Sequence, residues 1–257
     1  MIKKISLFVL LILFSGCAQN VGSGVDTSEN TQLTNQKTLA LASLQRRNFK
    51  RALEEIEIAQ KMDNKDPEVY LIEGLIYFAL EDMVKAEDLY KHALNLDKDY
   101  SEANFNLCVL YVNTKKYTQA IEYCEKAAED RLYRSRYKAY TLIGVSYFNN
   151  GDREKAKEYF DKSLSVEPKF FYTHNELGKL QVSYGNTNEA IYEFKLAIEY
   201  NPNYVESYYN IAKTYSSIND IQNACSSFRK VLELAPDTDY GFTARNYVNS
   251  FCIDKIN

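Results

Sequence analysis

The chain has 257 residues, of which 46% are hydrophobic and 26% are charged, enough for one sizeable domain or two smaller ones. Its formal net charge is −4 and no strongly basic block occurs in it, which argues against a nucleic-acid-binding surface. Nine glycines and four prolines are few for this length, so the composition favours helices over sheets.

The N-terminus predicts export. A short basic segment, "MIKK", precedes "ISLFVLLILF", an apolar segment too short to span a bilayer as a lasting helix. Small residues then stand before Cys17, which resembles the lipobox of bacterial lipoproteins. The resemblance implies a signal peptide over residues 1–16, lipidation of Cys17 and, because Ala18 rather than Asp follows, anchoring at the periplasmic face of the outer membrane. The alternative is an uncleaved signal anchor.

Residues 17–32 are polar, rich in Ser, Thr, Asn and Gly, and have no apolar period. This composition is typical of a flexible segment, so we expect a tether between the lipidated cysteine and the folded domain.

Small and large side chains recur along the rest of the chain with a period near 34 residues. Six alanines mark the period, with separations of 34, 34, 36, 34 and 34: Ala52, Ala86, Ala120, Ala156, Ala190 and Ala224. Twelve positions before each stands a small residue (Ala40, Gly74, Cys108, Gly144, Gly178 and Ala212), and four positions after each a larger one (Ile56, Tyr90, Cys124, Phe160, Phe194 and Phe228).

This pattern resembles the tetratricopeptide repeat, in which two antiparallel helices form a unit that buries its apolar face only by stacking on its neighbours. The resemblance implies an all-α solenoid of about six helix-turn-helix repeats over residues 33–66, 67–100, 101–136, 137–170, 171–204 and 205–238. Residues 239–257 would form a C-terminal capping helix and tail.

The repeat register predicts two disulfides. Cys108 takes the small position of a first helix and Cys124 the large position of the second helix of the same repeat, which antiparallel packing places opposite each other. Cys225 and Cys252 fall early in a second helix and late in the capping helix, two ends that also meet. An exported domain lies in an oxidising compartment, so both pairs are expected to be oxidised. The alternative is four buried free cysteines.

No catalytic site, metal site or cofactor is expected. The two histidines belong to different repeats: His92 is expected to face solvent, and His174 to be a polar wall residue of a groove. Carboxylates alternate with lysines, as in "EKAKEYFDK", which is typical of a solvated helix face.

Function is therefore expected in the concave groove lined by the first helices. Its candidate residues are mostly apolar in the second to fourth repeats: Leu71, Leu75, Phe78, Phe105, Val109, Val112, Val145 and Phe148. The corresponding positions become polar further on, at Tyr172, Asn175, Lys179, Tyr209 and Lys213. The apolar strip indicates a partner protein docking by its hydrophobic face. The alternative is that some of these side chains pack on each other.

The third repeat is two residues longer than its neighbours, and "DRLYRSRYKAY" fills that place. With the expected lipid anchor, this looks like the type IV pilus biogenesis and stability lipoproteins, a pilotin family. The resemblance implies a non-enzymatic protein that helps to target secretin subunits to the outer membrane and to assemble them, with a secretin segment as partner. The alternative is a general periplasmic scaffold lipoprotein for envelope hydrolases or outer-membrane protein assembly.

Overall fold

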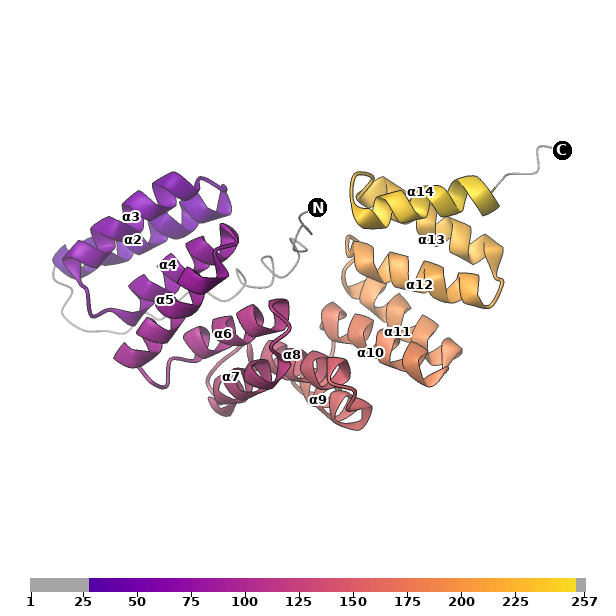
Figure 1. The fold of residues 1–257 in the computed structure, drawn as a ribbon, viewed down its shortest axis with the longest axis horizontal. Coiled ribbons are helices and arrows are strands. Elements are labelled where there is room, and N and C mark those ends of the chain that lie inside the picture. The colour runs from indigo at the N-terminus through magenta and orange to yellow at the C-terminus, as the bar shows by residue number, and fades with distance from the viewer. Residues whose placement is uncertain (1–27, 253–257) are drawn as a thin grey trace. The chain divides into compact units, whose positions relative to one another are not determined.

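The computed structural model describes residues 28–252, and within that range all regular structure is helical (Figure 1). The expected signal peptide, Cys17, the tether up to residue 27 and the tail after Cys252 lie outside the described residues. The helices are α2 (Ser28–Gln45), α3 (Phe49–Met62), α4 (Pro67–Ala79), α5 (Met83–Leu96), α6 (Ser101–Asn113), α7 (Tyr117–Glu129), α8 (Arg136–Asn149), α9 (Arg153–Val166), α10 (Phe171–Tyr184), α11 (Thr187–Tyr200), α12 (Val205–Ser217), α13 (Ile221–Leu234) and α14 (Asp239–Phe251).

The chain divides into two compact units, residues 1–146 and 147–257, with the division inside α8. In the first unit α2 packs on α3, α4 on α5 and α6 on α7. In the second unit α10 packs on α11, α12 on α13, and α14 covers α13. These hairpins and the final helix confirm the predicted all-α repeat architecture with a capping helix.

The turns inside the repeats confirm the period independently. Each carries one residue with positive φ, at the same place in the repeat: Arg47, Glu81, Lys115, Gly151, Gly185 and Asn219. Only glycine adopts this left-handed conformation without a steric cost, yet four of the six turns use other residues. The packing of the two helices therefore dictates the turn conformation there.

Four of the six second helices, α3, α5, α9 and α13, begin with a side-chain cap. The backbone N–H groups of Lys85, Lys155 and Asn223 donate to the Oδ1 atoms of Asp82, Asp152 and Asp220 over 3.1, 3.0 and 3.2 Å. Such caps bond backbone donors that have no partner inside the helix. The six alanines that mark the period are fully buried.

One boundary differs from the prediction. Helix α2 begins at Ser28, so residues 28–32, expected as the end of the tether, are helical. The expected boundary was the start of apolar periodicity, and the first buried side chain of the cluster is indeed Leu33. A helix extends beyond its packed part at little cost, however, because adding a turn is easier than starting one.

Candidate partner-binding site

The predicted apolar strip is largely covered by protein. Leu71, Phe78, Phe105, Val109 and Val145 are between 2 and 7% exposed, so these five side chains pack in the spaces between helices. The prediction that they line an open groove is wrong for these five.

The other three residues of the strip keep part of their surface. Leu75 is partly buried and packs against the first core cluster, and Val112 and Phe148 are also partly exposed. Whether they contact a partner stays a prediction.

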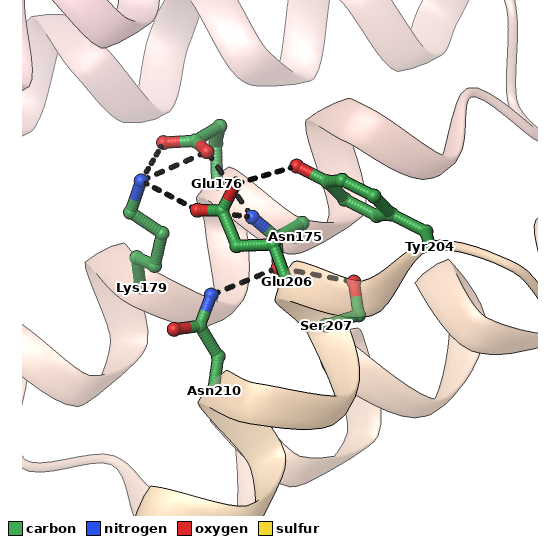
Figure 2. Close-up of polar contacts among 7 residues, drawn as sticks. All are labelled: Asn175, Glu176, Lys179, Tyr204, Glu206, Ser207 and Asn210. Carbon is green, nitrogen blue, oxygen red and sulfur yellow. Dashed lines mark hydrogen bonds and ion pairs between the residues drawn. The ribbon is translucent and has the colours of Figure 1, made fainter. Parts of the chain in front are cut away.

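The corresponding positions of the second unit hold a polar cluster, formed by residues of α10 and α12 and by Tyr204 just before α12 (Figure 2). Its members are Asn175, Glu176, Lys179, Tyr204, Glu206, Ser207 and Asn210. Asn175 lies at its centre, fully buried. The Asn175 Oδ1 atom accepts hydrogen bonds from Ser207 and Asn210, each at 3.0 Å, and Asn175 Nδ2 donates to Glu176 and Glu206 at 3.2 and 3.4 Å.

Two carboxylates of this cluster share one ammonium group. Lys179 Nζ lies 2.8 Å from Glu176 Oε2 and 3.5 Å from Glu206 Oε1. Burial raises the pKa of Glu176, whose side chain is 1% exposed. Burial alone would lower the pKa of Lys179, but the charges of Glu176 and Glu206 outweigh it and raise that pKa. The ammonium group of Lys179 therefore stays charged between the two glutamates.

Tyrosines surround the cluster. Tyr204 is 1% exposed and donates from Oη to Glu206 Oε2 over 2.9 Å. Tyr172, Tyr209 and Tyr240 are half-buried, and the rings of Tyr209 and Tyr240 lie 4.7 Å apart. Beyond them Lys213 is exposed, with its Nζ 5.5 Å from the centre of the Tyr209 ring. The half-buried tyrosines and the exposed Lys213 therefore form the accessible edge of a buried polar cluster, and a polar and aromatic edge of this kind suits recognition of a protein segment.

Both predicted cysteine pairs lie at disulfide distance. The Cα atoms of Cys108 and Cys124 are 5.1 Å apart, and those of Cys225 and Cys252 are 5.6 Å apart. The first pair is fully buried, whereas Cys225 and Cys252 are 5 and 9% exposed. Cys252 caps the C-terminus of α14, so the second pair fixes that helix to α13.

The predicted solvent exposure of His92 is correct, whereas the predicted position of His174 in the wall of a groove is wrong. His92 is exposed, as expected, with its ring 4.1 Å from that of Tyr70. His174 is 6% exposed and does not line a groove, because its ring nitrogens lie 2.7 Å from Glu193 Oε2 and 2.9 Å from the Pro168 carbonyl oxygen. It is a packing residue between α10 and α11.

Within residues 28–252, no group of three or more His, Cys, Asp or Glu side chains is placed to hold a metal ion. In the same range no helix is both long and apolar enough to cross a membrane.

Part of the polar cluster can be predicted from the sequence. Asn175 and Lys179 stood out because apolar residues occupy their positions in earlier repeats. Glu176, Glu206 and Tyr204 were missed, since each looks like an ordinary helix-surface or helix-start residue when its own repeat is considered alone.

Comparison with known proteins identifies the repeat. Three family models, each described as tetratricopeptide repeat, match residues 37–101, residues 77–142, and residues 137–170 with 205–238. Sperm-associated antigen 1 of Mus musculus is 28% identical over 157 residues, 59% of this chain. Hsp70-Hsp90 organizing protein 3 of Arabidopsis thaliana is 25% identical over 214 residues, 70% of this chain. The chain spans only 16 and 38% of the lengths of these relatives.

Two solved structures are similar over nearly their whole length. PilF of Pseudomonas aeruginosa has a TM-score of 0.73 at 19% identity, with 86% of this chain and 99% of that chain covered. PilW, described as a widely conserved type IV pilus biogenesis factor, has a TM-score of 0.74 at 23% identity, with 83 and 98% covered. At these identities the likeness shows a shared fold.

Proposed function

The chain belongs to the tetratricopeptide-repeat family of protein-interaction scaffolds, and from that premise we propose that it serves type IV pilus biogenesis as a pilotin. In this role it would be anchored in the outer membrane through Cys17 and would assist the targeting and multimerisation of a secretin. No catalytic step belongs to the proposal.

The observation that carries the proposal is the match in extent with PilF and PilW. The alignment covers 99 and 98% of those chains, whereas the curated relatives are much longer proteins of which this chain spans a fraction. A type IV pilus biogenesis factor thus matches most of this chain over nearly its own full length. The lipobox resemblance around Cys17 and the long third repeat agree with this role.

The test is to assay outer membranes from cells lacking the gene for secretin multimers that resist heat and SDS. We expect the multimers to disappear while secretin monomer remains, and the intact gene to restore them. Unchanged multimers in cells lacking the gene would refute the pilotin role and leave the general scaffold.

A pair of charge reversals locates the binding surface in the same assay. Lys213→Glu alters an exposed residue beside the polar cluster, and Lys195→Glu alters an exposed residue of α11. Both should leave the fold intact because neither side chain is buried. We expect Lys195→Glu to restore the multimers and Lys213→Glu to restore them poorly. Equal restoration would place the binding surface elsewhere.

A further inference from the structure

The long third repeat places an exposed leucine on the loop between α7 and α8. Leu132 is 89% exposed, the most exposed large hydrophobic side chain of the described residues. The loop around it is held in place: Asp130 accepts hydrogen bonds from the Leu132 backbone N–H through Oδ1 and from the Ser101 hydroxyl through Oδ2, both at 2.8 Å. The Tyr133 ring lies 6.0 Å from that of Phe105. The neighbours of Leu132 thus contact the protein, while the Leu132 side chain itself points into solvent.

Three of the chain's arginines lie within four residues of this leucine in the sequence. The sequence holds nine arginines, and Arg131, Arg134 and Arg136 fall within six residues. Among the residues that the structure describes, no carboxylate forms an ion pair with any of the three.

Lysines elsewhere behave differently. Lys61, Lys126 and Lys162 each lie 2.6 to 2.7 Å from a glutamate one helical turn away. The only carboxylate inside the loop is that of Asp130, and it already accepts hydrogen bonds from the Ser101 hydroxyl and the Leu132 N–H. These hydrogen bonds lower the pKa of Asp130. The loop thus presents three unpaired positive charges on a chain whose net charge is −4.

We propose that the segment Arg131–Arg136, which runs from the loop into the first residue of α8, is a second docking surface, which binds an acidic segment of a partner protein by inserting Leu132 into an apolar pocket between carboxylates. The choice of arginine favours a protein over a membrane. An anionic bilayer attracts lysine and arginine alike, whereas carboxylates are bound in a bidentate way by arginine. Protein interfaces are also enriched in arginine and depleted in lysine.

The test places a photo-crosslinking amino acid, p-benzoylphenylalanine, at position 132 of the full chain in its own cells. We expect irradiation to join it to one protein, at a segment that mass spectrometry shows to contain Asp or Glu. Replacing Arg131, Arg134 and Arg136 together by Gln should lower the yield about tenfold or more, because arginines at interface centres contribute strongly to binding. None of the three is buried, so the variant should keep its fold.

The matched control is the same crosslinker at Val84, the next most exposed apolar residue at 74%, which should not yield this product. Cross-links to lipid alone, a mapped segment without carboxylates, or a yield that the arginine changes do not alter would each overturn the proposal. The loop lies outside the polar cluster probed by Lys213→Glu, so these outcomes are separate from the result on secretin multimers.

Discussion

At the scale of single residues, one structural requirement is met in two ways. The ring of Tyr90 occupies the space where Gly74 has no side chain, and the ring of Phe194 does the same at Gly178. In the third repeat the same two positions hold Cys108 and Cys124 at disulfide distance. An aromatic ring packed over a glycine thus holds the first helix of a repeat against its second in two repeats, and a pair of cysteines does so in the third.

Gly74→Ala should therefore destabilise the protein. An added Cβ would lie 2.5 Å from Cε1 of the fully buried Tyr90 ring, so that this ring would have to shift inside the core. Overpacking of this kind costs about 1–3 kcal/mol, which a shift of the urea midpoint would reveal. Helix propensity alone predicts the opposite, a gain of roughly 0.5–1 kcal/mol. A stabilised variant would therefore show that the Tyr90 ring is not held in this place.

His174 should make stability depend on pH. Both of its ring nitrogens face acceptors, Glu193 Oε2 and the Pro168 carbonyl oxygen, and the Tyr200 ring packs 5.4 Å away. Burial opposes the charged ring, but the hydrogen bonds to Glu193 and Pro168 outweigh it, so the pKa of His174 is raised. Its stabilisation is therefore complete below the unfolded value of about 6.5 and is lost as the pH rises through the folded value.

The measurement is the urea midpoint of His174→Gln against the natural chain over a pH series. We expect a deficit of about 1–2 kcal/mol near pH 6 that shrinks toward pH 9, because hydrogen bonds of charged groups are the stronger ones. A deficit that does not vary with pH would mean that the pKa of His174 is the same in the folded and the unfolded chain, and would contradict the role of the charged ring.

At the scale of elements, the polar cluster joins first helices of successive repeats. Asn175 on α10 contacts Ser207 and Asn210 on α12, and Lys179 links Glu176 on α10 to Glu206 on α12. In the first unit the equivalent positions, such as Phe105 and Val109, are filled by apolar packing. Apolar contacts tolerate small shifts of one helix against another, whereas hydrogen bonds require a particular distance and direction. The hydrogen bonds of the cluster therefore fix the register of α10 against α12.

Lys179→Met should lower the free energy of unfolding, because Glu176 then loses its positively charged partner. Removing one member of a buried ion pair leaves an uncompensated charge, which costs about 2–3 kcal/mol here because the Lys179 side chain is 36% exposed. The pKa of Glu176 is already raised, so its carboxyl group protonates more readily as the pH falls. The loss of stability should therefore be larger at pH 8 than at pH 5. Lys213→Met, at an exposed lysine, is the control, and an equal loss in both variants would contradict the role of the pair.

At the scale of the whole chain, the sequence predicted what depends on packing inside one repeat. The period, the buried alanines and the position of Cys108 opposite Cys124 all follow from residues within one helical hairpin. The burial of Phe105 and Val109, and the bond of Asn175 to Glu206, depend on which side chains the next repeat places against them. Asn175 and Glu206 are 31 residues apart, and no local pattern shows that they meet.

A repeat array in which each hairpin contacts only its neighbours should also keep a disturbance local. Cys252→Ser removes the disulfide between Cys225 and Cys252 and so frees the end of α14. A disulfide that closes a loop of this length, with a sequence separation of 27, stabilises the fold by about 3.5 kcal/mol in the chain-entropy estimate. Hydrogen exchange followed by mass spectrometry should then show faster exchange in α14 and α13, a smaller change in α12, and none in α2–α7. Cys124→Ser is the matched control, because it should accelerate exchange in α6 and α7 instead. Exchange that rises equally in every helix after Cys252→Ser would show that the repeats unfold as one cooperative body, so that the capping helix stabilises all of them together.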